Sequence, residues 1–290
     1  MTSKPVLVRS RELVLRGDAR GPESGPAVLL LHGGGQTRHS WSAVAARLAA
    51  EGCRTLTMDL RGHGDSDWAP DGDYSVDAFA RDVVAMVAHI TGRPIVVGAS
   101  LGGMAALVAE GDAELGLSSG LVLVDIAPQM ETAGVERIVG FMTAHTDGFA
   151  SLDEAADAIA AYRPDRPRPR DLGGLEKNLR RGHDGRWRWH WDPRFLSPDT
   201  GASSSRRPAL LDDSARRVQV PTLLVRGRQS DLLSEAGAQH FLGMVPHARY
   251  VDVADAGHMV VGDRNDAFSG AVLDFVAEVH DTPVIGESVA

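Results

Sequence analysis

The chain has 290 residues, which is enough for one large α/β domain or two small ones. Its 43% hydrophobic and 24% charged residues are typical of a soluble globular protein with a sizeable core. The net charge of −9 argues against nucleic-acid binding, which needs a basic surface. The single cysteine, Cys53, excludes an intrachain disulfide and suits a reducing compartment. Because no signal segment follows Met1 and no apolar run could span a membrane, we expect a cytoplasmic protein that does not bind membranes.

Short apolar runs predict a series of strands. Two early runs, at residues 6–9 and 13–16, have the spacing of a hairpin. Further strands are predicted at residues 28–31, 56–60, 94–97, 121–125, 222–226 and 250–253. Helix candidates alternate with them, most clearly at residues 75–90, where apolar side chains recur at helical spacing. This alternation predicts a mostly parallel sheet with helices on both faces.

The segment between the strands at residues 121–125 and 222–226 is too long for one crossover helix. We therefore predict an inserted cap at residues 127–208, which divides the core into residues 1–126 and 209–290. Two helices are predicted within the cap, at residues 131–144 and 151–162. The Pro- and Arg-rich run at residues 163–170 cannot be a helix interior, because each proline removes a donor and clashes with the preceding turn. We interpret this run as a hinge.

The most informative motif is Gly98-Ala99-Ser100-Leu101-Gly102, which lies between a predicted strand and a run of good helix formers. A serine on a sharp strand-to-helix turn has a strained backbone. Glycines two residues on either side remove the Cβ atoms that would collide there. Such a turn exposes the hydroxyl at the carboxyl edge of the sheet, beside the first N–H groups of the helix. Ser100 is therefore the candidate nucleophile.

Three other motifs follow predicted strands. His32-Gly33-Gly34-Gly35-Gln36 has glycines that let backbone N–H groups approach a ligand, as an anion-stabilising hole requires. Arg61-Gly62-His63-Gly64-Asp65-Ser66 is interpreted as a structural turn. Ala256-Gly257-His258-Met259 follows the last strand. A serine nucleophile needs a base within hydrogen-bond reach, and the base needs a carboxylate that fixes its tautomer. His258 is the candidate base.

The order of these motifs resembles the α/β-hydrolase superfamily over residues 6–279. The resemblance implies a mostly parallel eight-stranded sheet with helices on both faces and an inserted helical cap. In that family the nucleophile, acid and histidine follow in that chain order, and Ser100, Asp231 and His258 fit it. Asp125, at the end of the preceding strand, is the rival for the acid. Asp255 is too close to His258 along the loop to orient its ring.

The same resemblance predicts the oxyanion hole. The N–H of Leu101, which follows the nucleophile, is one expected donor. The N–H of Gly34, the second residue after His32, is the other, and Gly33 is the fallback. No metal or organic cofactor is required by this chemistry.

Four tryptophans are candidate substrate-binding residues. Trp187, Trp189 and Trp191 recur at period two, which predicts an extended segment with one aromatic face. They either pack the cap onto the core or line a pocket. Trp41 either contributes to the pocket or anchors the helix that follows it.

The serine at the elbow discriminates between activities in the superfamily. Haloalkane dehalogenases and epoxide hydrolases of this fold place an aspartate there, so Ser100 argues against both. We expect a serine hydrolase that cleaves a carboxylic ester or lactone of a small, largely apolar molecule through an acyl-enzyme. The alternatives are a C–C bond hydrolase or cofactor-free perhydrolase with the same triad, and a small-molecule receptor on this fold. The expected partner is a small-molecule substrate, and the sequence leaves the oligomeric state open.

Overall fold

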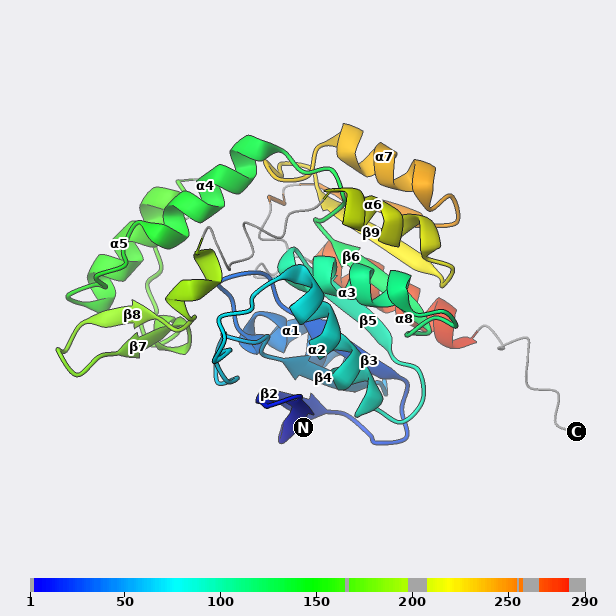
Figure 1. Cartoon of the computed structure of the whole chain (residues 1–290), viewed down its shortest axis with the longest axis horizontal. Coiled ribbons are helices and arrows are strands. Elements are labelled where there is room, and N and C mark those ends of the chain that lie inside the picture. Colours follow the sequence, from blue (N-terminus) through cyan, green and yellow to red (C-terminus); the bar gives the residue numbers. More distant parts are fainter. Residues whose placement is uncertain (1–2, 165–166, 198–207, 255, 258–265, 282–290) are drawn as a thin grey trace, which may run out of the picture.

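The computed structural model describes residues 3–164, 167–197, 208–254, 256–257 and 266–281 (Figure 1). In this part of the chain an eight-stranded sheet has the order β1-β2-β4-β3-β5-β6-β9-β10. Strand β2 is antiparallel to both of its neighbours, and all the other neighbouring pairs are parallel. The strands are β1 (Lys4–Ser10), β2 (Leu13–Arg20), β3 (Ala27–Leu31), β4 (Arg54–Met58), β5 (Ile95–Ala99), β6 (Gly120–Val124), β9 (Thr222–Gly227) and β10 (Arg249–Val253). The predicted mostly parallel eight-stranded sheet is confirmed.

Helices cover both faces of this sheet, as predicted. The core helices are α1 (Ser42–Ala50), α2 (Val76–Ala88), α3 (Leu101–Asp112), α6 (Pro208–Arg217), α7 (Glu235–Met244) and α8 (Asp266–Asp281). The helix predicted at residues 75–90 is α2, which begins after Ser75 because the Ser75 hydroxyl accepts a hydrogen bond from the Ala78 N–H.

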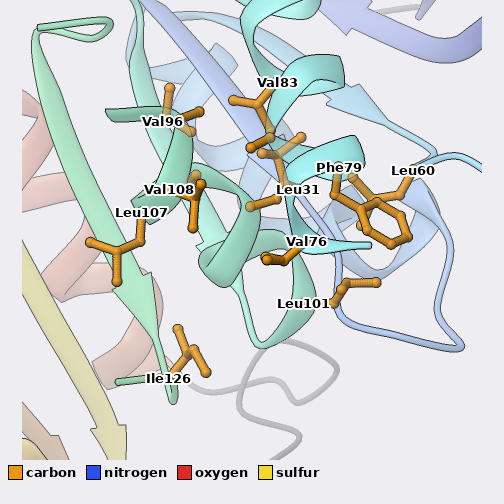
Figure 2. Close-up of a cluster of buried hydrophobic side chains, with 14 of the residues drawn as sticks. Leu31, Leu60, Val76, Phe79, Val83, Val96, Leu101, Leu107, Val108 and Ile126 are labelled. Atoms are coloured by element: carbon orange, nitrogen blue, oxygen red, sulfur yellow. The ribbon is translucent and has the colours of Figure 1, made fainter. Parts of the chain in front are cut away.

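Alternate residues of the central strands enter two separate hydrophobic clusters, because successive side chains of a strand point to opposite faces. Leu29 and Leu31 of β3 pack in the cluster that contains α2 and α3. Val28 and Leu30 pack in the cluster that contains residues of α1 and α8. Figure 2 shows part of the first cluster, where side chains of α2 and α3 gather around Leu31. The sheet is therefore the rigid middle layer that positions the loops at its carboxyl edge.

A cap leaves the core after β6 and returns at α6 (Figure 1). It contains α4 (Thr132–Thr143), α5 (Leu152–Tyr162) and a hairpin of β7 (Leu179–Arg181) and β8 (Trp187–Trp189). Both helices lie within one residue of their predicted bounds, and the described residues of the Pro- and Arg-rich run are not helical. Strand β7 was not predicted, because its sequence has no apolar alternation. The exact division at residues 127 and 208 stays a prediction.

The cap has a small hydrophobic core of its own, built around Phe149 between α5 and the hairpin. None of the helices in the described ranges combines the length and apolarity that a membrane span requires.

Candidate active site

Ser100 lies at the sharp turn between β5 and α3, with φ 45° and ψ −113°. The flanking glycines permit this turn. A Cβ atom on Gly98 would lie 2.5 Å from the Gly102 carbonyl oxygen, and one on Gly102 would lie 2.7 Å from the His32 carbonyl oxygen. The predicted strained strand–turn–helix is therefore present. It holds Ser100 at the carboxyl edge of the sheet.

Two backbone N–H groups near Ser100 can form an oxyanion hole. Leu101 is the first residue of α3, so its N–H has no acceptor within the helix. The N–H of Gly33 donates to Gln36 Oε1 (3.1 Å), and the N–H of Gly35 donates to His63 Nε2 (3.1 Å). Of these three glycines, only the intervening Gly34 has an N–H for which the described residues provide no acceptor. The structure thus favours Gly34 over the fallback Gly33 as the second N–H donor of the oxyanion hole.

Gly34 is also close to Leu101, the neighbour of the candidate nucleophile Ser100. A Cβ atom built on Gly34 would lie 3.9 Å from Leu101 Cβ, and one on Gly33 would lie 3.4 Å from Ser100 Cβ. The glycine loop therefore lies directly beside the elbow. This is the arrangement that two N–H donors need if they are to bind one developing oxyanion.

Three buried histidines pack against the glycine loop at residues 33–35, on the side away from the cavity. His32 Nε2 accepts a hydrogen bond from the Leu60 N–H (3.0 Å), and His32 Nδ1 donates to the Gly33 carbonyl (2.8 Å). His63 Nε2 accepts from the Gly35 N–H, and His190 of the cap lies with its ring centroid 5.8 Å from that of His63. An imidazole nitrogen can accept a hydrogen bond only when the ring is neutral.

Burial keeps these rings neutral. Desolvation lowers the pKa of His32 to about 4 and the pKa of His63 to about 3, and it lowers that of His190 well below its ordinary value. Neighbouring histidine rings lower the pKa of His63 and His190 further, and the positive charge of Arg38 lowers that of His32. His63 therefore has the structural role that the sequence predicted for its turn.

Beside these histidines, the cap contacts the core through hydrogen bonds. His190 Nδ1 accepts from the Gly64 N–H (2.7 Å), and the Asp192 N–H donates to the Gly62 carbonyl (2.9 Å). The buried Tyr74 hydroxyl donates to Asp192 Oδ2 (2.6 Å). The Arg61–Ser66 turn thus serves as the docking point for the chain that follows β8. Sequence reasoning missed His190 and Asp192, because their partners lie more than a hundred residues away along the chain.

Two carboxylates compete for the acid position, and Asp125 is the first. It directly follows β6, is fully buried and has φ 50°. Its Oδ1 accepts from the Gly227 N–H (3.0 Å) and its Oδ2 accepts from the Ser230 hydroxyl (2.5 Å).

Asp231, the acid predicted from the sequence, has different surroundings. Its Oδ2 lies 3.1 Å from Arg137 of α4, in an ion pair whose side chains are 37% and 53% exposed respectively. The residue before it, Ser230, is the one that contacts Asp125. The structure thus places Asp231 in a contact between the β9–α7 loop and the cap.

His258, like Asp255, lies outside the described residues, but the chain just before it is described. A Cβ atom on Gly227 would lie 2.6 Å from the carbonyl oxygens of both Ala256 and Gly257. Gly227 is also the residue whose N–H donates to Asp125. The chain that leads into His258 is therefore packed against the residue that holds Asp125.

A cavity of about 680 Å³ lies between the core and the cap and is lined by Ser100, Leu101 and Gly34. This volume is typical of sites for small molecules. Its cap side is largely apolar and includes Val135, Ile138, Met142, Trp189, Trp191 and Leu196. Among the described residues, no group of histidine, cysteine and carboxylate side chains is arranged to hold a metal ion.

The tryptophans divide into two groups. Trp189 and Trp191 line the cavity with their rings stacked, 5.0 Å apart at an angle of 10°. Trp41 is fully buried and packs against Phe268 on the opposite face of the sheet from α2 and α3. Trp187 pairs through its backbone with Phe149.

The positions of Trp41 and Trp187 do not support their predicted role in substrate binding. Neither is among the described residues that line the cavity. Trp41 anchors the start of α1, which was the other interpretation of that residue. Trp187 packs against the Phe149 cluster, as Trp189 also does, but of the two only Trp189 lines the cavity.

This fold and this elbow define an α/β hydrolase, and sequence comparison agrees. A family profile described as "Alpha/beta hydrolase family" matches residues 28–271. The esterase Rv0045c of Mycobacterium tuberculosis is 31% identical over 267 residues, which cover 89% of this chain and 84% of that protein. The chain therefore belongs to the alpha/beta hydrolase family.

Two further relatives extend the comparison. The 3-hydroxybutyrate-oligomer hydrolase of Cupriavidus necator is 28% identical, with 82% of this chain and 84% of that protein covered. The solved structure of E-2-(acetamidomethylene)succinate hydrolase superposes with a TM-score of 0.82 at 24% identity, covering 95% of this chain and 100% of that one. This last similarity concerns the fold alone.

Proposed function

We propose that the chain is a serine hydrolase that cleaves a carboxylic ester or lactone of a small, largely apolar molecule. The observation that supports this most is the position of Ser100. It lies on a strained turn at the wall of the cavity between core and cap, beside the N–H groups of Leu101 and Gly34. The relatives named as esterase and as 3-hydroxybutyrate-oligomer hydrolase support ester hydrolysis in particular.

In the proposed mechanism, His258 removes the proton from Ser100 Oγ as this oxygen attacks the ester carbonyl carbon. The carbonyl oxygen becomes negative and is stabilised by the N–H groups of Gly34 and Leu101. His258 then returns the proton to the departing alcohol, which leaves an acyl group on Ser100. Water, deprotonated by His258, attacks the acyl-enzyme and releases the acid and the free serine.

We propose Asp125 in place of Asp231 as the carboxylate that orients His258. Asp125 is buried at the sheet edge, next in register to Ser100, and Gly227 joins it to the segment before His258. Asp231 pairs with a cap arginine in a partly exposed site. A carboxylate that must stabilise an imidazolium acts more strongly where water is excluded.

The nucleophile is tested by Ser100→Ala. Wild-type protein should hydrolyse short p-nitrophenyl esters and should be labelled once by a fluorophosphonate probe. The variant should lose both properties, with kcat reduced by up to about 10⁶-fold, and should keep its melting temperature. Labelling of the wild type without turnover would indicate a receptor on this fold. Turnover by Ser100→Ala above about a hundredth of the wild-type kcat would refute the assignment.

A further inference from the structure

The described side chains that line the cavity carry charge of a single sign. Its charged or titratable lining residues in the described chain are Arg163, Lys177, His39 and Tyr162, and no aspartate or glutamate is among the described residues that line it. The chain as a whole has more acidic than basic residues, 39 against 30. The described lining of the cavity is therefore positively charged, although the chain as a whole is negatively charged.

Lys177 belongs to the short 3-10 helix Leu175–Asn178, which precedes β7 of the cap. Its side chain is exposed, so it lies where the cavity meets solvent. The neighbouring Asn178 accepts a hydrogen bond from the Thr37 hydroxyl (3.5 Å), just beyond the glycine loop. This contact joins the cationic part of the cap to the loop that carries Gly34.

His39 reports on the electrostatic potential at this side of the cavity. Its pKa is lowered chiefly by burial and further by the positive charges of Arg38 and Lys177, while Asp59 and Asp18 act in the opposite direction. Arg38 is already occupied by ion pairs with Asp18 and Asp59. Lys177 is the cation near His39 that also lines the cavity.

Arg163 supplies the second cation, at the end of α5. It follows Tyr162, whose ring stacks on Phe141 with centroids 4.2 Å apart, and all three residues line the cavity. The stack fixes the last turn of α5 and therefore the point from which the Arg163 side chain starts. Arg163 and Lys177 thus enter the same cavity from separate segments of the cap.

We propose that this cationic lining, with Lys177 at the mouth, binds an ionised carboxylate of the substrate. The substrate class is then an ester that carries a second, free carboxylate, with the ester carbonyl at Ser100. An anion that enters a largely apolar cavity needs such partners, because an unpaired buried charge is costly. This inference rests on the proposed function, which supplies the reaction at Ser100.

The test compares p-nitrophenyl hemiesters of dicarboxylic acids with neutral p-nitrophenyl esters of equal acyl carbon number. Suitable pairs are glutarate with pentanoate, pimelate with heptanoate and azelate with nonanoate. The leaving group is the same throughout, so differences in kcat/KM report the terminal carboxylate. We expect the wild type to favour the anionic member of at least one pair by about tenfold or more, and this preference to weaken at high salt.

Lys177→Glu should abolish that preference. We expect kcat/KM for the favoured hemiester to fall by about tenfold or more, mainly through KM, and kcat/KM for its neutral partner to change less than about twofold. Lys177→Arg should retain the preference. Arg163→Gln should reduce it, by lowering kcat/KM for the hemiester more than kcat/KM for the neutral ester. Arg181→Glu is the matched control, because it makes the same change in net charge at an exposed position of β7 in the same cap.

The outcomes separate the two proposals. If wild type hydrolyses both members of every pair equally well, or if Lys177→Glu and Arg181→Glu lower the hemiester rate equally, the carboxylate site is refuted while ester hydrolysis stands. If wild type hydrolyses neither the hemiesters nor the neutral esters and Ser100 is not labelled, the proposed ester hydrolysis itself is refuted. Melting temperatures of the Lys177 and Arg181 variants should match the wild type, because both residues are exposed.

Discussion

Ser100 and Asp125 are the residues that directly follow two neighbouring parallel strands, and both have positive φ angles, 45° and 50°. Ala99 of β5 pairs with Val124 of β6, and the Ser100 N–H donates to the Val124 carbonyl (3.1 Å). Positive φ in a residue other than glycine costs on the order of 1–3 kcal/mol and persists where the surroundings fix it. Two such residues side by side at one sheet edge indicate a functional position.

This relationship predicts the ranking of two acid variants. Asp125→Asn should lower kcat for a p-nitrophenyl ester by about 10⁴-fold, because an amide favours the unproductive tautomer of the histidine. Asp231→Asn should change kcat by less than about threefold, since it removes only a partly exposed ion pair. Steady-state kinetics of both variants check this, with circular dichroism to show that each is folded. The reverse ranking would return the acid to Asp231.

The acid illustrates what the sequence could not decide. Asp231 lies at a plausible distance before His258 along the chain, and spacing gives no information about which carboxylate turns inward. The choice between Asp125 and Asp231 depends on the β5–β6 register and on the contact of Ser230 with Asp125. Both of these join parts of the chain that are distant in sequence. The turn at Ser100, by contrast, has a local sequence pattern, because the strand, the two glycines and the helix formers are consecutive, although the carbonyl group that Gly102 approaches belongs to distant His32. It could be predicted in detail.

In the cap, too, local features could be predicted from the sequence and long-range contacts could not. Its two helices followed from local patterns, and Ser151 caps α5 by accepting from the Glu154 N–H. Periodicity also predicted an extended aromatic segment. It could not show that Trp189 lines the cavity while Trp187 does not, because that depends on how the hairpin lies against the core.

The buried histidines predict that the protein loses stability in mild acid. Their pKa values in the folded state are depressed to about 4 for His32 and about 3 for His63. The unfolded chain therefore binds protons first, below about pH 6.5. The free energy of unfolding should fall as the pH is lowered from 6.5 towards 4, by about 2 kcal/mol per histidine at pH 5. Urea unfolding at pH 7 and pH 5 measures this difference.

The contribution of one histidine can be isolated by substitution. His63→Asn removes a titrating ring. Its amide can replace Nδ1 as donor to the Arg61 carbonyl, but it is too short to replace Nε2 as acceptor for the Gly35 N–H. The variant should be less stable at pH 7 and should show a smaller loss between pH 7 and pH 5. His183→Asn, at an exposed position of the cap, is the control and should retain the wild-type difference. An unchanged pH dependence in His63→Asn would show that other groups cause the acid sensitivity.

Trp189 and Trp187 provide a matched pair on one strand. Trp189→Ala enlarges the cavity, so kcat/KM for bulky esters should rise relative to short ones. Trp187→Ala should leave that ratio within about twofold of wild type and act on stability alone, because its ring packs with the Phe149 cluster. The ratio of kcat/KM for p-nitrophenyl benzoate and acetate provides the measurement. Equal ratios in both variants would place the specificity elsewhere in the cap.

Tyr74→Phe tests how the cap is fastened. The buried Tyr74 hydroxyl donates to Asp192 Oδ2 (2.6 Å) and accepts from the Ala69 N–H (3.0 Å). Its removal leaves a buried N–H without an acceptor and should cost about 2 kcal/mol in the free energy of unfolding. Because Asp192 begins the segment that docks on Gly62, amide hydrogen exchange should accelerate at residues 179–196 more than in β5 and β6. If exchange accelerates equally in the cap and in these central strands, the contact stabilises the core as a whole and does not fasten the cap.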